Sequence, residues 1–152
     1  MTITLDPKVR AITVEEVLPH TPETIWKVLT RSDLIARWLM QNNFEPGLGR
    51  RFTMKAQPMG DWDGTVACEI TTWDPPRRLA YTWVGGSSTN PRYGSALDST
   101  VTWDLSTVAG GTHVRMVHDG FRSPGNDMGY DAMSGGWKTV LDRIGAIAAE
   151  LG

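Results

Sequence analysis

His118 is the residue of this sequence whose type and setting are best suited to proton transfer near neutral pH. It shares alternating parity with Val114 and Met116, so on a β-strand the three side chains point to one face. If that face lines a cavity, a neutral imidazole could hydrogen-bond a ligand or act as general acid or base. The alternative is a structural histidine, satisfied by backbone groups at the strand end. Both hypotheses stay open at this point.

Metal and thiol chemistry are not expected. The positions of His113 and His118 differ by five, an odd number, so a regular strand points them to opposite faces, where they cannot share a metal ion. A zinc site built from cysteines needs several of them, and the sequence has one. Cys68 follows the parity of Val66 and Ile70, which predicts a small buried side chain.

The carboxylates give no stronger signal for catalysis. Glu69 and Asp104 alternate with the apolar residues of their segments. Their side chains are therefore predicted to face solvent, unless a β-bulge turns one of them to the other side of the sheet. No nucleophile elbow, phosphate-binding loop or dinucleotide fingerprint occurs. We therefore predict no catalytic residue, no metal and no cofactor, and a binding protein is favoured over an enzyme.

Most of the chain has the period of β-strands. Six segments alternate between apolar and polar residues and are separated by turn residues. The predicted strands are 10–18, 51–57, 64–73, 78–84, 100–107 and 112–119.

Three segments have a helical period instead. Thr21 and Pro22 form a helix start, with a hydroxyl N-cap and a proline in the first turn, and predict a short helix to about Thr30. A second short helix follows to Leu39. The longest apolar stripe runs almost to the C-terminus and comprises Met133, Trp137, Val140, Leu141, Ile144, Ala148 and Leu151.

Glycines interrupt the first half of this long helix, at Gly129, Gly135 and Gly136. A glycine in a helix interior costs about 1 kcal/mol relative to alanine. Two explanations remain open: the helix is frayed or starts late, or its backbone closely approaches the sheet or a ligand.

A long helix with a wide apolar stripe needs a sheet to cover it. The sequence therefore predicts an α+β fold in which six antiparallel strands curl around the C-terminal helix, with two short helices after the first strand. No repeat or linker is visible, so residues 1–152 are interpreted as one domain.

The composition excludes several classes of partner. A net charge of −2 gives no general attraction to nucleic acid. No segment approaches the roughly 20 apolar residues of a membrane span, and the first ten residues lack the apolar core of a signal peptide. A single cysteine suits a reducing compartment, so a cytoplasmic location is expected.

The order of several short motifs resembles the START-like superfamily (also called SRPBCC or Bet v 1-like), and within it the family related to the activator of Hsp90 ATPase. The matching residues are Pro22–Leu29, Trp38, Pro46-Gly47, Gly64–Val66, Pro75–Leu79, Tyr81–Trp83, Gly111-Thr112, Val114, Met116, His118, Gly136-Trp137 and Leu141. The resemblance implies the helix-grip fold and a cavity between the long helix and the sheet. It implies no particular reaction, because a fold does not determine a function.

Strand parity and the helix stripe together predict the residues that face this cavity: Trp38, Met54, Tyr81, Trp83, Trp103, Met116, His118, Met133 and Trp137. The same residues could instead fill a solid core. We favour a cavity that binds a small hydrophobic or aromatic molecule.

Three alternatives concern activity and partners. One is an enzyme of the cyclase or hydrolase kind that uses His118 or Tyr81 as proton donor in the same pocket. Another is a co-chaperone of Hsp90, although the sequence lacks the separate N-terminal domain of the eukaryotic co-chaperones. Homodimerisation through a sheet edge or through the apolar segment 38–40 is also compatible with the sequence.

Overall fold

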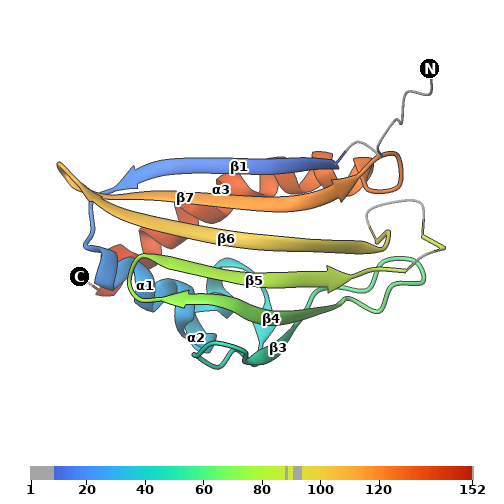
Figure 1. The fold of residues 1–152 in the computed structure, drawn as a ribbon, viewed down its shortest axis with the longest axis horizontal. Coiled ribbons are helices and arrows are strands. Elements are labelled where there is room, and N and C mark those ends of the chain that lie inside the picture. Colours follow the sequence, from blue (N-terminus) through green and yellow to red (C-terminus); the bar gives the residue numbers. More distant parts are fainter. Residues whose placement is uncertain (1–8, 88, 91–93, 152) are drawn as a thin grey trace, which may run out of the picture.

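One antiparallel sheet and three helices make up the fold. The computed structural model describes residues 9–87, 89–90 and 94–151. The strands lie side by side in the order β1-β7-β6-β5-β4-β3-β2. Figure 1 shows α3 lying across one face of the sheet, with α1 and α2 beside its C-terminal half. The strands are β1 (Val9–Leu18), β2 (Gln41–Asn42), β3 (Arg51–Lys55), β4 (Thr65–Asp74), β5 (Arg78–Gly85), β6 (Leu97–Val108) and β7 (Gly111–Arg122).

The predicted class of fold is confirmed, but the number of strands is wrong. The sheet has seven strands, because β2 pairs with β3 through Gln41 opposite Lys55 and Asn42 opposite Met54. A two-residue strand is too short to show an alternating pattern. The six predicted strands correspond to the other six, and β6 and β7 extend a few residues beyond their predicted ends.

The two short helices form where they were predicted. Helix α1 (Pro22–Thr30) starts at Thr21, whose hydroxyl accepts a hydrogen bond from the backbone N–H of Thr24 at 3.2 Å. Helix α2 (Ser32–Trp38) follows after a single residue. Both turn their apolar side chains inward, and the buried ones are Ile25, Val28, Leu29, Leu34, Ile35 and Trp38.

Helix α3 (Asp127–Leu151) is continuous and begins before its apolar stripe, so of the two explanations for its glycines the late start is wrong. Close approach of other parts of the protein does not explain two of its glycines either. A Cβ atom added to Gly135 or Gly136 would meet no atom within 4 Å. The buried stripe includes Ile147, whereas Leu151 at the helix end is 42% exposed.

A bulge near the end of β7 changes the parity of that strand. Arg10 of β1 faces Phe121, whereas Ala11 faces Asp119, so Gly120 is the extra residue. Only glycine fits at this position, for two reasons. Its φ is +116°, and a Cβ atom added there would lie 2.8 Å from the carbonyl oxygen of Asp98. The bulge lets both His118 and Phe121 point into the core, where both are buried.

Candidate functional site

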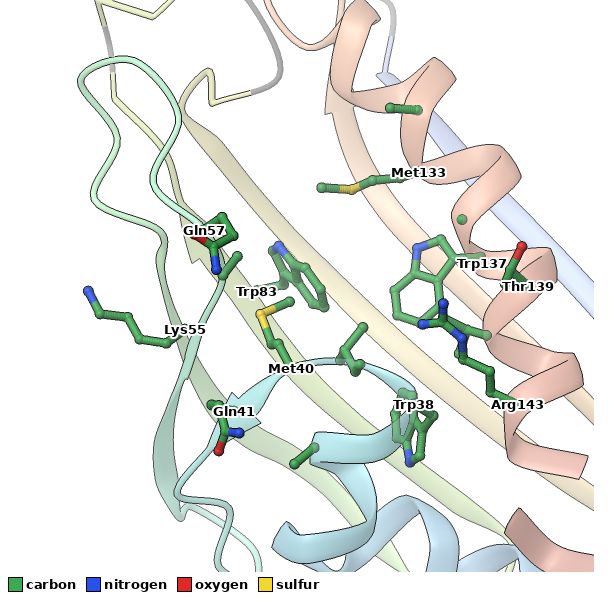
Figure 2. A pocket seen from close by; sticks show the side chains of 16 residues that line it. Trp38, Met40, Gln41, Lys55, Gln57, Trp83, Met133, Trp137, Thr139 and Arg143 are labelled. Atoms are coloured by element: carbon green, nitrogen blue, oxygen red, sulfur yellow. The ribbon is translucent and has the colours of Figure 1, made fainter. Parts of the chain in front are cut away.

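A pocket of about 860 Å³ lies between α3, the strand β5, the end of β3 and the segment that joins α2 to β2. Figure 2 shows Met133 reaching from α3 toward Trp83 and Met40 approaching Trp83 from the other side. The larger apolar side chains that line the pocket are Trp38, Leu39, Met40, Trp83, Met133, Trp137 and Val140. Four of the nine predicted residues are in this lining: Trp38, Trp83, Met133 and Trp137.

Edge-to-face contacts between tryptophans build the pocket wall. The ring centroids of Trp83 and Trp137 are 5.8 Å apart, and Trp103 lies behind them, 5.9 Å from Trp137. Trp103 also contacts Trp38 at 5.6 Å. Such pairs are worth about 0.5–1.5 kcal/mol each beyond the area they bury. The wall is therefore a stiff surface anchored in the core.

Trp38 holds the other side of the pocket in place. Its indole N–H donates a hydrogen bond of 2.8 Å to the carbonyl oxygen of Val28. Val28 belongs to the last turn of α1, whose carbonyls lack partners within the helix. The same side chain therefore caps α1, joins it to α2 and presents an aromatic face to the pocket.

His118 lies outside the pocket lining and is fully buried. Its Nδ1 accepts a hydrogen bond from the indole N–H of Trp137 at 3.1 Å, and its Nε2 lies 2.8 Å from the Ser99 hydroxyl. That hydroxyl donates to the carbonyl oxygen of Trp83 at 2.8 Å. These bonds are mutually consistent for a neutral ring protonated on Nε2. Burial lowers the pKa of His118 to about 3.

The bonding of His118 gives it a structural role. Both ring nitrogens have partners, and these partners are side chains, not the backbone groups of the structural alternative. Through Trp137 and Trp83 the imidazole fixes two tryptophans that line the pocket. A ligand contact by His118 itself stays a prediction.

The other four predicted residues lie in the closed core behind the pocket: Met54, Tyr81, Trp103 and Met116. The Tyr81 hydroxyl accepts a hydrogen bond of 3.1 Å from the indole N–H of Trp103. Burial raises the pKa of Tyr81 above its ordinary value of 10.0. Direct contact of these four side chains with a ligand likewise stays a prediction.

The pocket has a polar rim that the sequence prediction missed. Its members are Gln41, Lys55, Gln57, Thr139 and Arg143. Strand parity pointed Lys55 outward, and Arg143 flanks the apolar stripe of α3 instead of belonging to it. The spacing of Thr139 and Arg143, one helical turn apart beside that stripe, is the signal that could have found them.

The remaining titratable candidates lie away from the pocket. Cys68 is buried, and desolvation raises the pKa of its thiol to about 12. Glu69 and Asp104 are on the outer face as predicted, where they pair with Arg51 and Arg78. Among residues 9–87, 89–90 and 94–151, no three His, Cys, Asp or Glu side chains are placed to hold a metal ion. No helix in these ranges is long and apolar enough to cross a bilayer.

A curved antiparallel sheet, a long C-terminal helix across it and a pocket between the two define a START-like helix-grip domain. The family model described as activator of Hsp90 ATPase homolog 1-like protein matches residues 19–149. The chain belongs to this family.

Solved structures agree with this assignment. Protein MLL2253 from Mesorhizobium loti is 34% identical, with a TM-score of 0.82 over 94% of this chain and 99% of that one. Protein BH1534 from Bacillus halodurans is 20% identical, with a TM-score of 0.72 over 94% and 99%. CalU16 from Micromonospora echinospora is 22% identical, with a TM-score of 0.70 over 92% and 76%. The last two show the fold alone. No curated protein matches the chain.

Proposed function

We propose that this protein binds a small hydrophobic or aromatic molecule in the pocket between α3 and the sheet. The observation that carries the proposal is the tryptophan wall beside about 860 Å³ of space. Small-molecule sites are concave, mostly apolar and about 300–1,000 Å³ in volume, with a few polar groups that orient the ligand. The lining combines both kinds of group, since three tryptophans and two methionines face a rim of five polar side chains.

The two helix glycines supply a sharp test of this proposal. Gly136 lines the pocket, whereas its neighbour Gly135 does not, and both have free space where a side chain would start. Gly136→Leu should therefore fill part of the pocket, while Gly135→Leu adds the same side chain elsewhere on the helix.

Thermal unfolding against a panel of naphthalenes, anthraquinones and medium-chain acyl compounds measures the binding. A ligand present at about 100 times its Kd stabilises the protein by about 2.7 kcal/mol, which raises Tm by several degrees in a domain of this size. We expect the rise in the wild type and in Gly135→Leu, and its loss in Gly136→Leu. Equal shifts in both variants, or no shift with any compound, would contradict the proposal.

Catalysis by His118 or Tyr81 has less support from the geometry. Neither residue lines the pocket, and their polar atoms bond to core partners. The described lining contains no histidine or carboxylate that could take their place. Binding without turnover is therefore the function we propose.

An Hsp90-linked role is a second candidate because the family description names an activator of Hsp90 ATPase. The experiment is the steady-state ATPase rate of Hsp90 from the same cell, with and without this protein. A saturable increase would support the role, and an unchanged rate together with failure to co-purify would remove it.

A further inference from the structure

Arg143 lies at the pocket with an unmatched charge. It is on α3, one turn beyond Thr139, and both side chains belong to the pocket lining. In the described ranges Arg143 has no ion pair or hydrogen bond. The nearest acidic side chain on its face of the helix is Glu150, two turns further on, and Glu150 is bound by Arg37 at 2.6 Å. The guanidinium therefore has all its donors free.

The second cation of the rim, Lys55, already has bonding partners. Its ammonium lies 2.6 Å from the hydroxyl of Thr65 and 3.9 Å from the carboxylate of Asp63. Figure 2 shows the Lys55 side chain directed away from the space between Trp83 and Trp137. Both cations line the pocket, and of the two only Arg143 has no hydrogen-bond or ion-pair partner in the described ranges.

The rest of the lining offers donors and no counter-charge. No Asp or Glu of the described chain lines the pocket. Trp83 lies in its wall, and no acceptor in the described ranges takes its indole N–H. A ligand that satisfies this surface must have an apolar body for the tryptophans and an anionic acceptor for the guanidinium, since a planar guanidinium matches a carboxylate with two parallel hydrogen bonds.

We propose that the pocket selects amphipathic carboxylic acids, with the apolar body against Trp83 and Trp137 and the carboxylate on Arg143. This inference rests on the proposed binding function and names the class of ligand. Because Arg143 is exposed, solvent weakens its attraction. We expect an acid to bind about five- to tenfold more tightly than the matching neutral alcohol, and the preference to shrink in about 0.5 M salt.

Calorimetric titration with two matched pairs of probes tests the proposal: 2-naphthoate against 2-naphthalenemethanol, and dodecanoate against dodecanol. The variant is Arg143→Gln, and the control is Lys138→Gln, which removes one positive charge from the same helix outside the pocket lining. The wild type and Lys138→Gln should prefer the acid, while Arg143→Gln should bind acid and alcohol equally.

The possible failures are distinguishable. If the alcohols and acids bind equally to the wild type, or if Arg143→Gln keeps the preference, the role of Arg143 is wrong and the binding function stands. If Lys138→Gln loses the preference as well, a general charge effect replaces the specific contact. If none of the four probes binds, both proposals fail for ligands of this kind.

Discussion

At the scale of single residues, the buried histidine links two tryptophans of the pocket wall. His118 connects Trp137 to Ser99 and, through the Ser99 hydroxyl, to the backbone of Trp83. A buried polar group is stable when each of its atoms has a partner, and costs about 1–3 kcal/mol when one is lost. Its hydrogen bonds therefore hold two walls of the pocket in one arrangement.

This arrangement predicts a pH dependence of stability. Burial lowers the pKa of His118 from 6.5 to about 3, so below pH about 6.5 the unfolded chain binds a proton that the folded protein does not. The stabilisation is complete above the unfolded pKa and is lost as the pH falls toward 3. The loss is about 1.4 kcal/mol per pH unit.

Urea unfolding between about pH 7.5 and 4 measures this slope. His118→Gln should lower the free energy of unfolding at neutral pH and flatten its decline in acid. His113→Gln is the control, because it lies on the same strand and pairs with Glu15 outside the core. An unchanged slope in His118→Gln would mean that the imidazole does not stay neutral in the folded protein.

At the scale of elements, α3 combines packing with access to the pocket. Trp137, Val140 and Ile144 are buried on one stripe, while Gly135 and Gly136 leave a gap in the side chains one turn from the helix middle. Glycine lowers helix stability because its backbone is free in the unfolded chain. The two glycines thus lower the stability of the helix at positions where a larger side chain would not clash with any neighbouring atom.

Alanine substitutions separate these two effects. Gly135→Ala and Gly136→Ala should each raise the free energy of unfolding by about 0.5–1 kcal/mol, since a Cβ meets nothing at either position. Only Gly136→Ala adds a methyl group to the pocket surface. Chemical denaturation of both variants measures the gain. A loss of stability in Gly135→Ala would show that the helix backbone there is not free of contacts.

The long elements of this fold were predictable because their periods are long enough to be counted. The stripe of α3 runs from Met133 to Leu151, and the predicted alternation covers eight residues in each of β6 and β7. Strand β2 was missed because its two residues have no period. Parity correctly turned Met54, Met116 and His118 inward. Parity could not show which of the inward side chains line the pocket and which lie in the closed core. That distinction depends on where the α2–β2 segment lies in space.

At the scale of the whole molecule, the strands β6 and β7 are more extensively hydrogen-bonded than the β2 edge of the sheet. Strands β6 and β7 each have twelve residues and a hydrogen-bonded neighbour on both sides, and their inward side chains are buried against the core. On the pocket side, β2 has two residues and pairs only with β3. The pocket therefore lies beside the short, weakly paired edge of the sheet, and its lining includes no residue of β6 or β7.

Amide hydrogen exchange should show this difference directly. Exchange occurs through local opening, which needs less free energy where fewer buried contacts and hydrogen bonds are broken. We expect β6 and β7 to exchange slowest, near the free energy of global unfolding, and α2 and β2 to exchange orders of magnitude faster. Adding 2-naphthoate should slow exchange in α2, β2 and the middle of α3 while leaving β6 and β7 unchanged. Equal protection of all strands would contradict the expected difference between β6 and β7 on one side and β2 on the other. If 2-naphthoate slows exchange only in other elements, the ligand binds outside the pocket.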